Sequence, residues 1–153
     1  MKATPQSGNR RGAAGAEEAA FLDLLRTTDM LSRALVRVLK TEGLSSTQYN
    51  VLRILRGAGE KIPCGEIARR MITRDPDITR LLDRLEQRRL ISRGRESKDR
   101  RMVMARITGD GLKVLARLDG PIEATHRRQL GHLGKERLRA LTNLLGAARA
   151  AIR

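Results

Sequence analysis

The spacing of apolar residues changes once along this 153-residue chain, and this change constrains the fold more than any other feature. Over most of the sequence apolar side chains recur every three or four residues, which is typical of amphipathic helices. Across residues 91–95 and 103–107 apolar and polar side chains alternate instead, which is typical of β-strands. The polar run 96–101 lies between the two alternating segments. We therefore expect a β-hairpin with a basic tip within a mostly α-helical protein.

Two helices are expected at the start of the fold. Residues 17–41 carry apolar side chains at helical spacing, and Gly43 follows as a stop signal. The next helix is predicted to begin at Ser45, because Ser45 and Gln48 have the spacing of a capping box. The glycines of residues 57–59 are expected to end it.

Two shorter helices are predicted before the hairpin, the first over about residues 63–71 with Pro63 at its start. In the second, Asp75 is a good N-cap and Pro76 fits the first helical position. Helical spacing places the apolar residues of this second helix on one face and its arginines on the opposite face. The apolar face holds Ile78, Leu81, Leu82 and Leu85, and the basic face holds Arg80, Arg84 and Arg88.

Helices are also expected after the hairpin. Thr108 is a good N-cap for a fifth helix, which Gly120 and Pro121 should kink or break. The last helix is predicted over about residues 135–151, where leucines recur like a heptad seam. Before the first helix, residues 1–15 are small, polar and basic, and predict a disordered tail.

Positive charge is the strongest global feature of the composition. The chain has 32 Lys and Arg against 17 Asp and Glu, a formal net charge of +15. Residues 69–106 concentrate this charge, with thirteen Lys and Arg against six Asp and Glu. Such a balance favours a polyanion as partner, and nucleic acid is the commonest polyanion. Phosphate contacts would supply most of the affinity through counterion release.

The basic hairpin directly follows the two short helices in the predicted order. We interpret the two helices as a helix-turn-helix and the hairpin as a wing. A helix can enter the major groove, where base edges carry a full sequence code. A narrow basic hairpin can reach the adjacent minor groove, whose negative potential attracts arginine. Double-stranded DNA is therefore the predicted partner.

Other classes of function find little support in the sequence. It has no glycine-rich phosphate loop after a strand and no Ser-His-Asp or Cys-His arrangement, so we do not expect an enzyme. His126 and His132 lack the neighbouring ligands that a metal site needs, so we expect no metal and no cofactor. The sequence has one cysteine, no recognisable signal peptide and no apolar run of transmembrane length, so we expect a cytoplasmic protein.

Five short motifs follow one another along the chain. They are Ser46-Thr47-Gln48-Tyr49-x-Val51-Leu52, Thr79-Arg80-Leu81-Leu82-Asp83-Arg84-Leu85-Glu86, Leu90-Ile91-Ser92-Arg93, Asp99-Arg100-Arg101 and Thr108-x-x-Gly111. Each motif is weak alone, but their order and spacing are specific, and over roughly residues 20–150 the chain resembles the MarR family of winged-helix regulators. Pro63 and Gly134 depart from the family pattern, which often has a Ser or Thr cap at those places.

The resemblance implies a fold and a mode of action. Residues 16–153 are expected to form a single MarR-like unit, with a winged-helix DNA-binding part at 45–108 and dimerisation helices at 16–43 and 109–153. The family forms homodimers that bind near-palindromic operators. Many members repress nearby genes, and many release DNA when a small, often phenolic anion binds. We therefore expect a transcription regulator, most simply a repressor, with an unidentified small-molecule effector.

Candidate site residues come from the basic helix, from the wing and from the flanking helices. Arg80 and Arg84 are predicted to contact DNA, and Thr79 either contacts DNA or makes a hydrogen bond at the helix start. By resemblance, Asp99 orients an arginine that enters the minor groove, either Arg101 or Arg100. The candidate DNA-binding set is Arg74, Thr79, Arg80, Arg84, Arg95, Lys98, Asp99, Arg100 and Arg101, and the candidate dimerisation set is Phe21, Leu24, Leu138, Leu141, Leu145 and Ala148.

Several alternatives stay open at this point. Arg84 can pair with nearby acids on a solvated face instead of contacting DNA, and the protein can be a nonspecific, architectural DNA-binding protein instead of a regulator. Cys64 lies near a predicted helix N-terminus, where the pKa of a thiol can fall. The other interpretation of Cys64 is a small, partly buried thiol. Tyr49 and the arginines near it are the only hints of an effector site, and the sequence does not distinguish a repressor from an activator.

Overall fold

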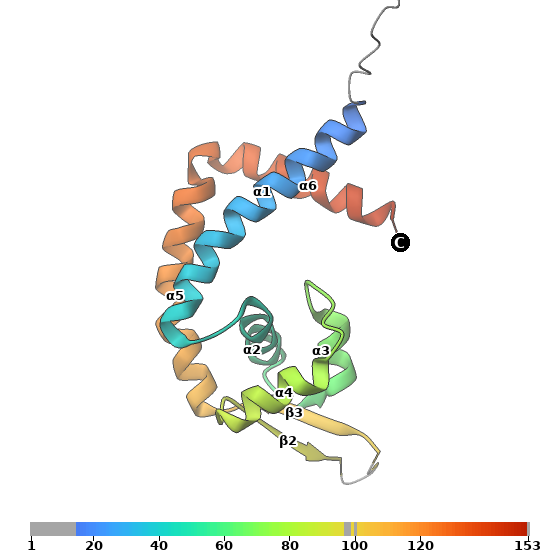
Figure 1. Cartoon of the computed structure of the whole chain (residues 1–153), viewed down its shortest axis with the longest axis vertical. Helices are drawn as coiled ribbons and strands as arrows, with labels where there is room; N and C mark the ends of the chain where they lie inside the picture. The colour runs from blue at the N-terminus through green and yellow to red at the C-terminus, as the bar shows by residue number, and fades with distance from the viewer. Residues whose placement is uncertain (1–14, 97–98, 100, 153) are drawn as a thin grey trace, which may run out of the picture. The chain divides into compact units, whose positions relative to one another are not determined.

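The computed structural model describes residues 15–96, 99 and 101–152, and the remaining residues lie outside the described part of the chain. The predicted tail at residues 1–15 falls almost entirely outside it. The chain divides into two compact units, residues 1–32 and 33–153, and each is described by itself. Helices and strands carry the labels of Figure 1.

The first unit holds the beginning of helix α1 (Ala16–Leu39), which continues into the second unit. Glu17 and Glu18 lie in its first turn, where the helix dipole favours acidic side chains. The apolar side chains of this part of α1 are largely exposed, and Phe21, for example, is 59% exposed. An apolar helical stripe of this kind is typical of a surface that another element or chain covers.

The second unit starts with the end of α1 and a well-defined helix start. A 3-10 turn (Lys40–Glu42) follows α1, and Gly43 adopts the left-handed conformation with φ of 62°. Helix α2 (Ser46–Ala58) then begins with a complete capping box. In this box the Gln48 amide donates to the Ser45 hydroxyl over 3.1 Å, and the Ser45 amide donates to the Gln48 side chain over 3.0 Å. The predicted start of this helix is confirmed.

Helices α3 (Cys64–Arg70) and α4 (Ile78–Gln87) form the predicted pair of short helices. The prediction that Asp75 caps α4 is wrong, because Asp77 is the cap. The Asp77 carboxylate accepts the amide of the third helical residue over 3.1 Å. The Asp75 carboxylate instead accepts the Asp77 amide over 2.9 Å. Asp75 thereby closes the turn before α4, and Pro76 lies in that turn and not in the helix.

The hairpin has the predicted bounds, with strands β2 (Ile91–Arg95) and β3 (Val103–Ile107) pairing antiparallel from the first residue of one to the last residue of the other. A third strand, β1 (Ile62–Pro63), pairs antiparallel with β3 and gives the order β1-β3-β2. The sequence did not predict β1, since two residues are too few for alternation to be recognised. Pro63 therefore ends a strand and precedes α3 instead of being its first residue.

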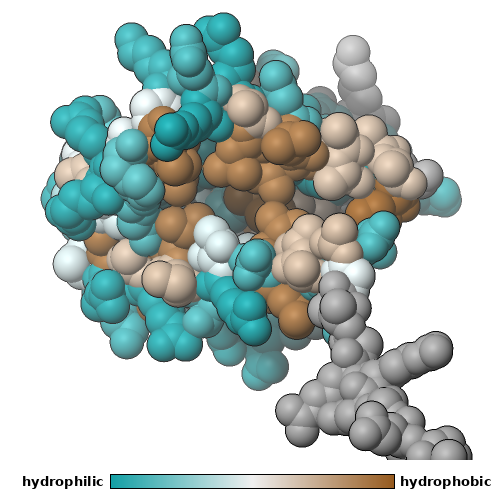
Figure 2. Space-filling model, turned by 90° about the horizontal axis from the view of Figure 1, so that it is seen from above, coloured by the Kyte–Doolittle hydropathy of each residue, from teal (hydrophilic) through white to brown (hydrophobic). Residues whose placement is uncertain are grey.

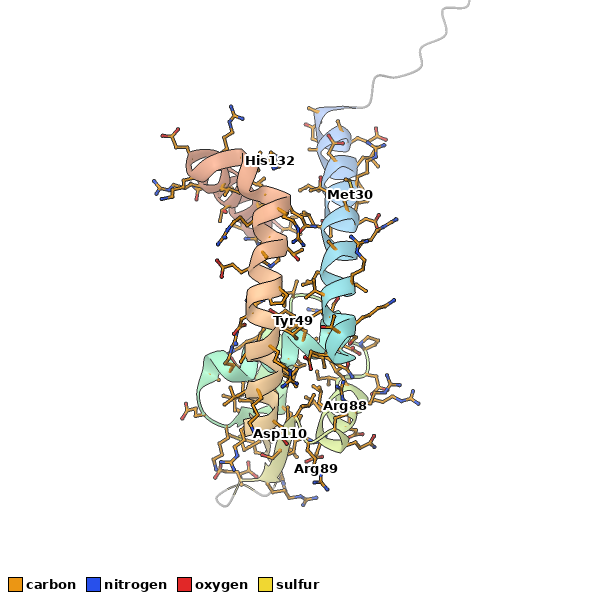
Figure 3. The ribbon with its side chains drawn as sticks, turned by 90° about the vertical axis from the view of Figure 1, so that its left-hand side faces the viewer. Met30, Tyr49, Arg88, Arg89, Asp110 and His132 are labelled. Atoms are coloured by element: carbon orange, nitrogen blue, oxygen red, sulfur yellow. The ribbon has the colours of Figure 1, made fainter. Side chains whose placement is uncertain are left out.

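Helix α5 (Gly109–Leu130) begins where the sequence predicts. The Thr108 hydroxyl accepts the Gly111 amide over 3.1 Å and donates to the Arg89 carbonyl over 2.7 Å. This single hydroxyl therefore caps α5 and also fixes it to the segment between α4 and β2. Figure 3 shows Asp110, in the first turn of α5, at the end of the molecule that also holds Arg89.

The predicted break at Gly120 and Pro121 is wrong, because α5 continues through Pro121 as one helix. Proline removes one backbone donor from a helix interior, but its neighbours here are held in place by the core. Leu118 and Ile122, on either side of it, are buried. A 3-10 turn (Gly131–Leu133) then leads to α6 (Gly134–Ala150), which has nearly the predicted bounds.

The core of the second unit is built from aliphatic side chains of α2, α4 and α5 and of the sheet. Full burial of each such side chain contributes about 1.5–3 kcal/mol relative to exposure. No helix in the described part of the chain has both the length and the apolar character that spanning a bilayer requires. The core residues that are almost fully buried are Leu39, Val51, Leu52, Leu55, Ile67, Leu82, Leu85, Ala105, Leu115 and Leu118.

Gly111 lies where the start of α5 is pressed against the base of the hairpin, and this contact generates a test. A Cβ atom at Gly111 would lie 2.3 Å from the Leu90 carbonyl oxygen and 2.7 Å from Ile107 Cγ1. We expect Gly111→Ala to lower the free energy of unfolding by about 1–3 kcal/mol, because overpacking forces the backbone to shift. Chemical denaturation followed by circular dichroism at fixed protein concentration measures the change.

Gly120→Ala is the matched control, because it lies in the same helix and its added Cβ would meet nothing within 4 Å. This variant should be unchanged or more stable by about 0.5–1 kcal/mol, since alanine favours a helix interior over glycine. Similar effects of the two substitutions would contradict the close contact at Gly111.

Candidate nucleic-acid interface

The outward face of α4 carries two arginines that have no carboxylate partner among the residues that the structure describes. Arg80 and Arg84 lie one helical turn apart and therefore share a face, and both are exposed. Within the described part of the chain, neither side chain forms an ion pair. A guanidinium group in this state has its donors available for phosphate oxygens or for the acceptor edge of guanine.

The two acids of α4 are bound by an arginine of the hairpin instead. The Arg93 side chain is only 19% exposed and forms ion pairs with both Asp83 and Glu86. Its Nε donates to Glu86 Oε2 over 3.0 Å, and its backbone amide donates to Glu86 Oε1 over 3.1 Å. Burial disfavours the charged form of Arg93, but the hydrogen bonds that it donates to Glu86 and Asp83 outweigh this effect and raise the pKa of the guanidinium.

This arrangement bears on the alternative in which Arg84 pairs with nearby acids. The sequence left open whether Arg84 pairs with nearby acids, and Asp83 and Glu86 were the closest acids along the helix. Both carboxylates are bound by Arg93, so Arg84 does not form that pair. The same contacts fix the hairpin against α4, which holds the two predicted DNA-binding elements in one arrangement.

Arg88 does not belong to the free basic face, although helical spacing suggested that it did. Its guanidinium donates to the carbonyl of Gly43 and to the carbonyl of Glu42, each over 2.8 Å. Figure 3 shows Arg88 and Arg89 at the hairpin end of α5, opposite the end at which His132 lies. Arg88 is therefore a structural residue that ties the end of α4 to the turn before α2.

Two further predicted contacts flank α4 at its start. Arg74 lies in the turn before the helix and Thr79 is its second residue, and both are exposed. The helix start is already capped by the Asp77 carboxylate, so a cap is not needed from Thr79. Arg69 and Arg70 differ from Arg74, because both pair with Glu66 on α3.

Two hydrogen bonds join Asp99 to the residues at the start of the second half of the hairpin. The Asp99 carboxylate accepts the Arg101 amide over 2.9 Å, and the Asp99 carbonyl accepts the Met102 amide over 3.0 Å. Asp99 thus fixes the backbone that carries Arg101, whose side chain is exposed, as is that of Arg95. Lys98 and Arg100, the two other predicted contacts of this loop, lie outside the described residues.

The structural contacts of Arg93 and Arg88 were not predicted from the sequence. For Arg93 a usable signal was present, because Asp83 and Glu86 lie three residues apart and so point the same way from α4. For Arg88 no local signal exists, because its two acceptors are backbone carbonyls about 45 residues earlier in the chain.

The candidate dimerisation residues lie on α1 and α6. In the first unit, Phe21 and Leu24 are exposed. On α6, Leu138 and Leu145 are half-buried, Leu141 and Ala148 are exposed, and Leu144, which was not predicted, is 70% exposed. In the space-filling view of Figure 2, apolar residues, coloured brown, are exposed on the face that is turned toward the viewer.

Cys64 and Tyr49 are the residues for which the sequence left a further role open. Burial raises the pKa of the Cys64 thiol, which favours its interpretation as a small, partly buried thiol. Tyr49 belongs to the core, and the Arg53 guanidinium lies 5.7 Å from its ring centre. In the described part of the chain no group of three or more His, Cys, Asp or Glu is placed to hold a metal ion.

The arrangement of these elements defines a class of protein. A helix-turn-helix whose second helix presents unpartnered arginines, followed directly by a basic antiparallel hairpin, is the architecture of a winged-helix DNA-binding protein. Figure 1 shows α4 and the hairpin together at one end of the second unit.

Known proteins narrow this class to a family. The MarR family model matches residues 44–103. The chain is 30% identical over 125 residues to the transcriptional regulator PecS of Dickeya dadantii, covering 80% of this chain and 75% of PecS. It is 39% identical to a MarR transcription factor of Planctomyces limnophilus of known crystal structure, with a TM-score of 0.67, covering 90% of this chain and 99% of that one. The chain belongs to the MarR family of DNA-binding transcriptional regulators.

A more distant structure shares the fold. BpsR of Bordetella bronchiseptica is 20% identical, with a TM-score of 0.80, and the match covers 90% of this chain and 98% of BpsR. The DNA binding of BpsR is regulated by 6-hydroxynicotinic acid.

The contact of Arg93 with Asp83 and Glu86 generates a prediction. Arg93→Met should lower the free energy of unfolding by about 1–2 kcal/mol, because it leaves two half-exposed carboxylates without their shared partner. Thermal or chemical unfolding checks the change. Adding Glu86→Gln to Arg93→Met should recover part of the loss, and a double variant no more stable than the single one would contradict the role of charge.

Proposed function

We propose that this protein is a sequence-specific transcriptional repressor that binds a near-palindromic operator as a homodimer. In this proposal α4 enters the major groove with Arg80 and Arg84, and Arg74 and Thr79 contact the flanking backbone. The hairpin reaches the adjacent minor groove with Arg101. The observation that carries the proposal is the pair of exposed, unpartnered arginines on α4, beside a hairpin that Arg93 fixes to the same helix. The remaining proposed contacts are Arg95, Lys98, Asp99 and Arg100.

The exposed apolar side chains of α1 and of α6 support the homodimer. A single chain leaves large apolar side chains in contact with water at Phe21, Leu24 and Leu141. A two-fold dimer presents two copies of α4, about one turn of DNA apart. Because the two copies are related by symmetry, they bind two inverted half-sites, which together form a near-palindrome. A dimer that covers two successive major grooves blocks access to the DNA between them. We therefore propose repression by occupancy of a promoter.

We also propose that a small organic anion releases the protein from DNA. The regulation of BpsR by 6-hydroxynicotinic acid is consistent with such a response in this fold. The second unit has a pocket of about 880 Å³ between α2, the base of the hairpin and the start of α5. Leu55 and Leu112 line it together with Arg56, Lys61, Arg106 and Glu60. Arg56 and Lys61 already pair with Asp119 and Glu96, so Arg106 is the cation of this lining that we propose to meet the anion, beside the apolar side chains.

Selection of bound duplexes from a random pool, at near-physiological salt and with the full chain, tests the proposed function. The expected product is one near-palindrome whose half-sites lie about one helical turn apart. Light scattering at the same salt should give the mass of two chains. Binding to all duplexes with a steep salt dependence and no enriched sequence would support a nonspecific DNA-binding protein instead.

Arg84→Ala tests the assignment of α4. This variant should bind the selected operator more weakly by about 1–3 kcal/mol, because a guanidinium contact to a base or a well-placed phosphate is lost. Fluorescence anisotropy with the operator and with a scrambled duplex measures the change. Arg139→Ala, which removes an exposed arginine of α6, is the control for net charge and should have a smaller effect. An unchanged operator affinity in Arg84→Ala would rule out this assignment.

A further inference from the structure

Helix α5 is bound to the rest of the second unit by an ion pair on each of two sides. Arg117 Nε and Nη2 donate to the two carboxylate oxygens of Glu42, each over 2.8 Å. Arg56 Nη1 and Nη2 donate to the carboxylate of Asp119 over 2.8–3.0 Å. Both pairs are bidentate, which is the geometry that restricts orientation most.

The two ion pairs leave α5 in different directions. Arg117 and Asp119 are two residues apart, which corresponds to about 200° around the helix axis. Glu42 lies in the turn between α1 and α2, and Arg56 lies in the last turn of α2. One pair therefore resists rotation of α5 in one direction, and the other pair resists it in the opposite direction.

The partners of α5 are themselves connected to the DNA-binding helix. The carbonyls of Glu42 and Gly43 accept hydrogen bonds from Arg88, which caps the end of α4. A chain of contacts consequently leads from α4 through the turn at residues 40–43 to Arg117 on α5. Arg56 extends from α2, which packs against both α4 and α5 in the core.

Because α5 is long, a small change in its angle to α2 and α4 moves its far end appreciably. The helix is continuous from Gly109 to Leu130, and Figure 3 shows Asp110 and His132 near its opposite ends. Ile122 is the last residue of α5 in the core, and the eight residues from there to Leu130 span about 12 Å at 1.5 Å per residue. A tilt of about 5° in the core would therefore move the far end of this helix by about 1 Å. In a two-fold dimer the displacement occurs in both chains and changes the separation of the two α4 helices.

We propose that the pairs Glu42–Arg117 and Arg56–Asp119 form an alignment clamp that sets the separation of the two α4 helices and thereby selects operators by half-site spacing. These four residues are positioning residues, because none of them lies on the face of α4 or on the wing tip that is proposed to contact DNA. The proposal rests on the proposed function, since spacing has a meaning only for a dimer on paired half-sites. It assigns a role in alignment to two bidentate ion pairs, in one of which the Glu42 carboxylate is largely shielded from solvent.

The test measures dissociation constants for a series of operators in which the spacing of the half-sites is changed by up to two base pairs in either direction. Two double variants remove the clamp with opposite changes of charge, E42Q/D119N and R56Q/R117Q. Their overall affinities should shift in opposite directions, because one variant gains and the other loses positive charge. Both variants should nevertheless discriminate less between spacings. The ratio of the dissociation constants for shifted and best operators should fall about threefold or more relative to the wild type.

Two further variants separate alignment from general damage. E123Q/R127Q removes an ion pair that lies within α5 and bridges no other element, so the spacing profile should match that of the wild type. The exchange E42R/R117E keeps the net charge and allows the pair to form again, so the profile should sharpen relative to the single variants E42Q and R117Q, which break the same pair and also leave Arg56–Asp119 intact. This recovery also answers the objection that the first variants are only less well folded.

The outcomes distinguish the inference from the function on which it rests. A wild-type optimum that survives unchanged in both clamp variants would overturn the clamp and leave the proposed function intact. An equal loss of spacing preference in E123Q/R127Q would also overturn the clamp. A wild-type protein with no preferred spacing would overturn both the clamp and the proposed dimeric operator.

Discussion

Burial of three leucines on one side of α4 determines what the other side of that helix presents to solvent. Leu81, Leu82 and Leu85 are buried in the core of the second unit. Because side chains are distributed around a helix at fixed angles, this burial turns Arg80 and Arg84 outward. Moving either arginine inward would remove leucines from the core and bury an unpaired cation, and both changes are unfavourable. The direction of the proposed DNA-binding face is therefore a consequence of packing.

The distribution of acids determines which of the many arginines stay free. A chain with a formal charge of +15 repels itself, and pairing relieves this repulsion where side chains lie close together. Asp83 and Glu86 bind Arg93, whose side chain is mostly buried, whereas Glu66 binds Arg69 and Arg70, which stay exposed. Among the described residues, the cations without a carboxylate partner include Arg80 and Arg84. The acids of α4 thus bind an arginine of the hairpin and leave the outward arginines of the same helix without a counter-charge.

Local patterns predicted most of the fold. The capping box at Ser45 and the alternation in the hairpin gave the correct element bounds, because both features depend on residues that are neighbours in the sequence. The start of α4 was misplaced because Asp75 and Asp77 are both good caps, and only the path of the turn decides between them. The continuity of α5 at Pro121 depends on burial of its neighbours, and the contacts of Arg88 depend on residues far away in the chain. Such effects have no local signature.

The candidate site was predicted less completely than the fold. The positions of Arg80 and Arg84 on an outward face follow from helical spacing, but their freedom from acids depends on Arg93, which belongs to a different element. The individual DNA contacts stay predictions, as do the dimerisation residues.

The short strand β1 has a consequence for how the hairpin can adapt to DNA. Ile62 and Pro63 pair with Ala105 and Met104 of β3, so the inner half of the hairpin is part of a three-stranded sheet. Pro63 directly precedes α3, so bending this inner half would also displace the first helix of the helix-turn-helix. The pairing with β1 therefore couples the base of the hairpin to the first helix of the helix-turn-helix, and any adjustment of these strands on DNA would also move α3.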